Sequence, residues 1–196
     1  MSMSELHKPE WYGECAIISD KYNDYVQIKY KCNGTGTLYD YSLFPGINLI
    51  FMDFNCSDIF HEPIPNKNII EIRHYQKGRV EFELRNNKVF HMKEGELCIN
   101  ALANVPAAYS FPFGYSVGLS CVIDKDSIDA KTKQIFSYYN IDVLNLGQEL
   151  EIEKKWFLCR TPQRLLHIFD ELYAAKGVEG KDYFRIKLLE LFYHIK

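Results

Sequence analysis

Residues 73–100 read RHYQKGRVEFELRNNKVFHMKEGELCIN, and apolar side chains recur there at many alternate positions. This period of two is typical of β-strands with one buried face. The pair Asn86–Asn87 marks a turn between two such strands. A two-residue loop would pair Phe82 with His91, whereas a three-residue loop would pair Phe82 with Phe90. Because the longer loop matches apolar with apolar side chains, we expect that register, with His91 exposed to solvent.

The same period extends on both sides of this stretch, from about residue 14 to residue 123. In YVQIKYKCNGTG, apolar residues alternate with lysines, and INLIFMDF is nearly continuously apolar, as expected for a strand covered on both faces. In NIIEIRHYQKG, Ile72 and His74 share one face, which we take to be the inward one. Glu71 and Arg73 share the other face. The pattern predicts a run of short antiparallel strands.

After Asp124 the apolar period becomes that of a helix. A short first helix is expected in DSIDAKTKQIFSYYN. A second is expected after Thr161 and Pro162, because threonine suits an N-cap and proline suits the first helical turn. Its apolar stripe consists of Leu165, Ile168, Phe169 and Leu172.

The last helix, from about Asp182, carries two apolar lines. The first is Phe184, Leu188, Leu191 and Ile195, and the second is Tyr183, Ile186 and Leu189. A helix that is apolar on two sides needs two partners, so we expect it to pack on its own sheet and on a second copy of the chain. We assign the interface between two copies to the first line.

Length and composition restrict the function. The chain has 196 residues, a net charge of -3 and a pI near 6.1, and no lysine or arginine run longer than a pair, so it is a poor nucleic-acid binder on its own. No segment approaches the roughly 18 apolar residues of a membrane span, and no export signal is evident, which predicts a cytoplasmic protein with no membrane partner. The cysteines form no C-x-x-C pair, so we expect reduced thiols.

The strand series with its Gly–Glu turn resembles a cupin jelly roll. The metal-binding form of that fold carries His-x-His after a glycine and a third histidine in a later strand. If Gly78 is that glycine, Leu84 and Asn86 occupy the histidine positions, and no histidine follows in ELCINALANVPAAY. We therefore expect no metal or other cofactor and no catalytic residues, and we interpret His74 as a core histidine or a lone pocket imidazole.

The segment GELCINALANVPAAY also resembles the phosphate cassette of cyclic-nucleotide-binding domains. That family places an arginine directly after the proline, where this chain has Ala107. A cyclic-nucleotide sensor is thus a weaker alternative. A second alternative is a stand-alone cupin enzyme or small-molecule-binding protein.

Taken together, FPGINLIFMDF, NIIEIRHYQKGRVEFEL, HMKEGELCIN, SFPFGYSVGLSCVID and RLLHIFDELYAAKGVEGKDYFRIKLLELFYHIK look like the N-terminal sensor half of an AraC/XylS-type transcription regulator. The resemblance implies a mainly β fold with C-terminal α structure: a cupin-like jelly-roll sandwich or barrel at 1–125, with an N-terminal arm at 1–13, then a helical dimerisation segment at 126–196. It also implies a small effector, a homodimer and no catalysis. DNA would be read only by a C-terminal helix-turn-helix domain that this chain lacks, and the uncapped end at Lys196 suggests a fragment.

Strand parity nominates side chains for the effector pocket. They are Tyr30, Ile72, His74, Phe82, Phe90, Tyr109 and Phe111, with Trp11 and Tyr12 of the N-terminal arm as weaker candidates. Such a ring-lined pocket favours an amphipathic or aromatic ligand over a highly charged one.

Overall fold

The computed structural model describes residues 12, 15–60, 66–84, 89–103, 106–146 and 148–195. The strands are β1 (Ala16–Lys21), β2 (Val26–Tyr30), β3 (Gly34–Phe44), β4 (Ile47–Cys56), β5 (Asp58–Phe60), β6 (Asn66–Leu84), β7 (Val89–Lys93), β8 (Glu96–Leu102), β9 (Pro106–Ser110), β10 (Ser116–Asp124) and β11 (Phe157–Arg160). The helices are α1 (Ala130–Tyr138), α2 (Gln163–Ala175) and α3 (Lys181–Ile195), with a short 3₁₀ turn at Gln148–Leu150.

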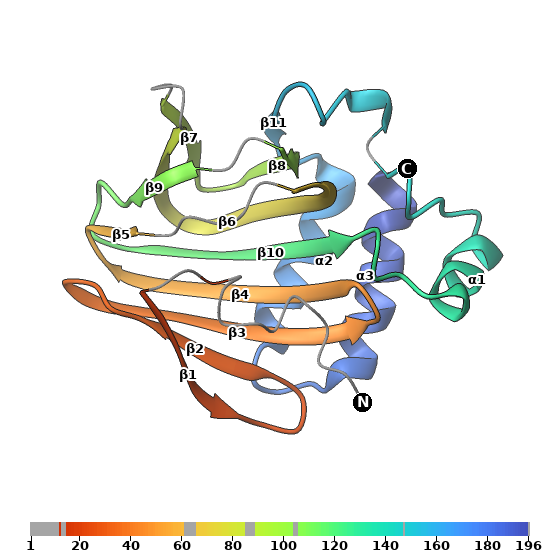
Figure 1. Cartoon of the computed structure of the whole chain (residues 1–196), viewed down its shortest axis with the longest axis horizontal. Helices are drawn as coiled ribbons and strands as arrows, with labels where there is room; N and C mark the ends of the chain where they lie inside the picture. Colours follow the sequence, from red (N-terminus) through yellow and green to blue (C-terminus); the bar gives the residue numbers. More distant parts are fainter. Residues whose placement is uncertain are drawn as a thin grey trace.

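The strands form a curled antiparallel sheet with the order β1-β2-β3-β4-β10-β6-β8-β11, and β5, β7 and β9 extend it beyond the far half of β6. Helices α2 and α3 lie against one face of this sheet, as Figure 1 shows. The predicted mainly β class with C-terminal helices is confirmed. One strand falls outside the expected series, because β11 pairs with β8 from within the segment expected to be helical.

Strand β6 bends at Gly78 and so belongs to two parts of the sheet. Before the bend it pairs with β10 and β8, and after it with β7 and β9. Gly78 has a φ of +87°, and a Cβ there would lie 2.5 Å from the Tyr115 carbonyl oxygen, so only glycine fits. Beyond the bend, Phe82 pairs with Phe90 and His91 is exposed, which confirms the predicted hairpin register.

Both faces of the sheet are buried, each in its own hydrophobic core. The core on the helix side combines sheet residues such as Leu49 and Leu119 with Leu165 and Phe169 of α2. The core inside the curl contains side chains such as Ile28 and those of several aromatic residues. The sheet and the helices therefore share the helix-side core.

The helices largely follow their sequence signals. Asp129 caps α1 by accepting a hydrogen bond of 2.7 Å from the Thr132 backbone N–H. The apolar stripe of α2 is buried, as predicted. The expected Thr161 cap is wrong, since Pro162 occupies the N-cap position, no side chain bonds there, and the buried Thr161 hydroxyl has no described partner.

The first apolar line of α3 faces this chain's own core. Phe184, Leu188 and Leu191 are fully buried, and the Phe184 ring lies 4.9 Å from the ring of Tyr41. Ile195 is partly buried against the same core. The assignment of this line to an interface between two copies is therefore wrong for the three buried residues. Within the second line, the side chain that faces outward is Ile186, which is 63% exposed.

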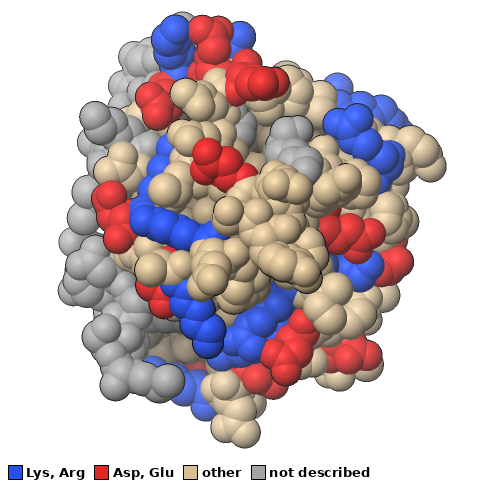
Figure 2. Space-filling view, turned by 90° about the vertical axis from the view of Figure 1, so that its right-hand side faces the viewer, with Lys and Arg blue, Asp and Glu red and all other residues tan. Residues whose placement is uncertain are grey.

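The surface carries charges of both signs. In Figure 2, the lysine and arginine side chains are interspersed with aspartate and glutamate on the face shown. None of the described helices has the length and apolar character needed to cross a membrane. All six cysteines are free thiols: Cys15, Cys32, Cys56, Cys98, Cys121 and Cys159.

Candidate functional site

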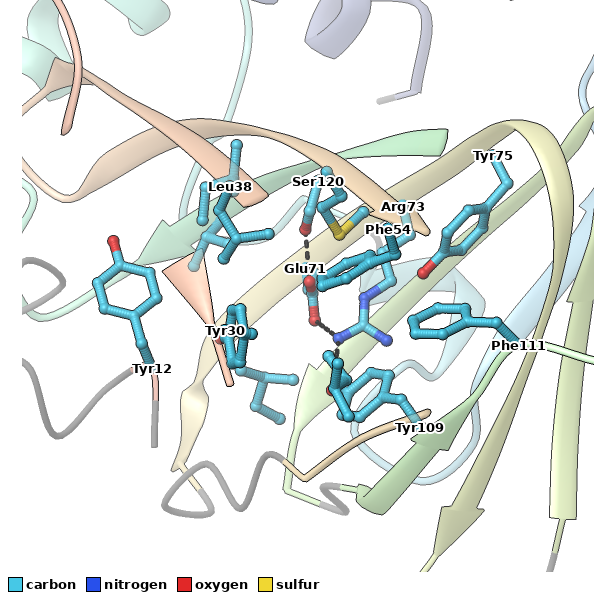
Figure 3. Close-up of a pocket in the computed structure, with 15 residues that line it drawn as sticks. Tyr12, Tyr30, Leu38, Phe54, Glu71, Arg73, Tyr75, Tyr109, Phe111 and Ser120 are labelled. Atoms are coloured by element: carbon cyan, nitrogen blue, oxygen red, sulfur yellow. Dashed lines mark hydrogen bonds and ion pairs between the residues drawn. The ribbon is translucent and has the colours of Figure 1, made fainter. Parts of the chain in front are cut away.

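A cavity of about 70 Å³ lies inside the curl of the sheet. Its walls come from β2, β3, β4, β5, β6, β8, β9 and β10 and the loop after β9, and Figure 3 shows the side chains that point into it. Most are apolar or aromatic, with a few polar groups gathered at one end. The lining residues are Tyr12, Tyr30, Leu38, Ile50, Met52, Phe54, Ile59, Glu71, Arg73, Tyr75, Leu102, Tyr109, Phe111, Ser120 and Val122.

The polar end is built around an ion pair on β6. Glu71 and Arg73 are two residues apart, so their side chains share the inner face of the strand, and an Arg73 Nη2 lies 2.6 Å from a Glu71 oxygen. Ser120 stands opposite Arg73 on β10, and its hydroxyl donates to the other Glu71 oxygen. Arg73 Nη2 also donates to the Tyr109 hydroxyl at 3.2 Å. The pairing register of β6 and β10 thus brings Glu71, Arg73 and Ser120 together.

The Arg73 guanidinium is buried among aromatic rings. Its central carbon lies 5.0 Å from the Phe82 ring centroid, 5.6 Å from that of Tyr109 and 5.9 Å from that of Trp156. Burial alone would lower the pKa of Arg73, but the Glu71 carboxylate together with Tyr109 and Tyr75 outweighs it, so the pKa is raised and the side chain stays charged. Its Nε and Nη1 atoms have no hydrogen-bond partner among the described residues.

Burial raises the pKa of the lining tyrosines Tyr30, Tyr75 and Tyr109 above the ordinary value, while Arg73 opposes that rise for the latter two. Their phenols are therefore protonated near neutral pH and act as hydrogen-bond donors as well as acceptors.

The opposite edge of the cavity holds a second buried carboxylate. Tyr12 donates to Asp40, and the Asn48 side-chain amide donates to the other Asp40 oxygen at 2.7 Å. Burial, and then the charge of Asp40, raises the pKa of Tyr12. Tyr12 does reach the cavity, whereas Trp11 lies outside the described residues.

Three of the nominated effector residues line the cavity: Tyr30, Tyr109 and Phe111. Phe82 and Phe90 belong to the same core but pack with Trp156, at centroid distances of 5.3 and 4.8 Å, instead of reaching the cavity.

Ile72 and His74 point the other way, toward the helices, so their placement in the pocket is wrong. Ile72 is fully buried in the helix-side core. The His74 ring stacks on Phe169 at a centroid distance of 4.2 Å, and its Nδ1 lies 3.1 Å from the Tyr173 hydroxyl. Burial lowers the pKa of His74 from 6.5 to about 4, so the ring is neutral near pH 7. It is a core histidine.

Sequence reasoning missed the polar centre formed by Glu71, Arg73 and Ser120. Parity correctly separates Glu71 and Arg73 from Ile72 and His74, but the face that lines the cavity is the charged one and not the face of Ile72 and His74. The available signal was a pair of opposite charges two residues apart within an otherwise apolar strand, because such charges are buried only when they are paired.

No group of three or more histidine, cysteine, aspartate or glutamate side chains is arranged to hold a metal ion in the part of the chain that the structure describes. His74, which faces the helices, contacts Tyr173 through a hydrogen bond and Phe169 through ring stacking.

No protein-family model matches this chain, and no match was found among curated proteins. Several solved structures are similar in fold. The AraC-like transcriptional activator CuxR matches with 8% sequence identity over 83% of this chain and 54% of its own, at a TM-score of 0.48. ToxT from Vibrio cholerae O395 matches with 8% identity over 76% of this chain and 56% of its own, at a TM-score of 0.41.

The Cupin_2 domain of an XRE-family transcriptional regulator from Enterobacter cloacae matches with 13% identity over 45% of this chain and 94% of its own, at a TM-score of 0.37. This chain spans about half the length of CuxR and ToxT. These similarities concern the fold alone.

Proposed function

We propose that this chain is the ligand-sensing module of a transcription regulator and binds a small molecule in the cavity inside the curled sheet. The observation that carries the proposal is the cavity itself, with apolar walls and a buried polar end where Arg73 keeps unused donors. This combination of apolar lining and a few convergent polar groups is characteristic of small-molecule sites. Dimerisation, and DNA contact through another domain, belong to the proposal and rest on the sequence resemblance.

Strand β6 offers a route from the cavity to the helices. Arg73 faces the cavity, and the next residue, His74, faces α2, where it stacks on Phe169. The Tyr173 hydroxyl also donates to the His74 backbone carbonyl at 2.9 Å. A ligand that shifts β6 at Arg73 therefore displaces the contacts that position α2. In a regulator, this displacement would be the signal passed to the rest of the protein.

Binding is favoured over catalysis by the state of the carboxylate at the cavity. The two Glu71 oxygens accept from Arg73 and from Ser120, so both are already engaged within the protein and neither is left to act on a bound substrate. A stand-alone binding protein or enzyme is the competing function. To distinguish a regulator from both, a variant with a blocked cavity replaces the natural protein in the source organism. A change in transcription of the adjacent genes would support the regulator.

The cavity is tested with Val122→Phe, which fills it from β10, and with Val89→Phe as the matched control, since Val89 on β7 is 64% exposed. A panel of small amphipathic compounds is screened by thermal shift on the unmodified protein. We expect the compounds that raise its melting temperature to have no effect on Val122→Phe and to retain their effect on Val89→Phe. Equal shifts in both variants would show that the ligands bind elsewhere and would refute the proposed site.

A further inference from the structure

The charge balance at the polar end of the cavity restricts the class of ligand. Glu71 and Arg73 are buried side by side, at 2.6 Å, with side chains 8% and 6% exposed. Their opposite charges cancel, and Ser120 and Tyr109 add only neutral hydroxyls. A ligand group that reaches this end thus meets a polar cluster that has no net charge.

The unused hydrogen-bonding capacity there consists of donors. Arg73 spends Nη2 on Glu71 and Tyr109, whereas its Nε and Nη1 lack partners among the described residues. Figure 3 places the guanidinium in the middle of the lining side chains, with Glu71 on one side and Phe111 on the other. Burying N–H donors without an acceptor costs free energy, so a ligand oxygen that accepts from these donors makes binding more favourable.

We propose, on the basis of the sensing function above, that the cavity selects small neutral molecules whose carbonyl, ether or hydroxyl oxygen accepts a hydrogen bond from Arg73. A carboxylate would place a second negative charge beside Glu71 without a second cation, and a buried uncompensated charge is strongly unfavourable. A cationic ligand would meet Arg73 with the same penalty. The apolar walls, including Leu38, Ile50 and Val122, take the ligand's hydrocarbon part.

The volume restricts the size of the ligand. At about 70 Å³ the cavity is smaller than the roughly 150 Å³ engineered cavity that binds benzene. It therefore accommodates only a small, compact molecule. Such small ligands bind in the millimolar range because each heavy atom contributes only a limited free energy.

The experiment compares isosteres that differ in charge: methyl isopropyl ketone and isobutyramide as neutral acceptors, isobutyrate as the anion and isobutyramidinium as the cation. Binding is followed in proton–nitrogen correlation spectra through the Arg73 Nε–H signal, which is assigned by its loss in Arg73→Lys. We expect the two neutral compounds to shift this signal and to bind at least about tenfold more tightly than either ion.

Glu71→Gln provides the sharper test, because it keeps the shape and an acceptor for Ser120 while leaving the charge of Arg73 uncompensated. In this variant we expect the order to reverse, with isobutyrate bound more tightly than the ketone. The double variant Glu71→Gln/Arg73→Met is neutral and has no guanidinium donors, and we expect it to lose ketone binding. Because this variant lacks the Arg73 Nε–H signal, its binding is followed through the backbone amide signals of β6 and β10, which are also recorded for the unmodified protein.

The outcomes separate this inference from the proposed function. If isobutyrate or isobutyramidinium binds the unmodified protein as tightly as the ketone, the ligand class is refuted while the sensing site stands. If none of the four compounds binds, both fail. If Glu71→Gln does not fold, the ranking on the unmodified protein still decides.

Discussion

His74 gives the fold a pH dependence whose size follows from its surroundings. The ring is 5% exposed, stacks on Phe169 and has its pKa lowered by burial from 6.5 to about 4. Between these two pH values the unfolded chain binds a proton at His74 that the folded chain does not. The free energy of unfolding therefore rises with pH across this window and falls on acidification.

One pKa unit corresponds to about 1.4 kcal/mol, so acidification from about pH 7.5 to about pH 5 should cost about 2 kcal/mol through this group alone. Replacing His74 by phenylalanine keeps a ring to stack on Phe169 and removes the titration. The Tyr173 hydroxyl retains its bond to the backbone carbonyl of residue 74.

The assay is urea unfolding of the unmodified protein and of His74→Phe at both pH values. The unmodified protein should lose about 2 kcal/mol more than the variant on acidification. The control is His91→Phe, since His91 is exposed on β7, and it should behave like the unmodified protein. Equal losses in the unmodified protein and His74→Phe would refute the buried, neutral histidine.

Other perturbations test the packing and the site. Leu188→Glu buries a charge in the helix-side core and should destabilise the protein by more than about 4 kcal/mol in chemical denaturation. Ile186→Glu, on the outer side of α3, should change stability by less than about 0.5 kcal/mol. Similar effects of the two substitutions would contradict the orientation of α3. Arg73→Met leaves Glu71 unpaired and should lower the free energy of unfolding by about 3 to 5 kcal/mol. Adding Glu71→Gln should recover most of this loss. A double variant no more stable than Arg73→Met would argue against the ion pair. Gly78→Ala should cost at least about 1 to 2 kcal/mol in thermal unfolding, because alanine must adopt a positive φ against the Tyr115 carbonyl, and an unchanged melting temperature would exclude the bend.

Local sequence patterns were sufficient for features that depend on neighbouring residues. The period of two located the strands, and matching apolar partners identified the hairpin in which Phe82 pairs with Phe90. The helical period and its apolar stripe located α2. In each case the signal is contained within one element or one tight turn, where geometry leaves few alternatives.

Tertiary structure determined which layer of the protein covers each face of a strand or helix. Parity groups Ile72 with His74 and Glu71 with Arg73, but it does not say which group faces the cavity when helices cover the other face of the sheet. The apolar pair packs under α2, and the charged pair, neutralised by its own contact, lines the cavity. Phe184 and Leu188 likewise form an apolar line whose partner, this chain's own sheet, is far away in sequence. The physical reason is that alternation records burial, whereas the identity of the covering layer depends on long-range packing.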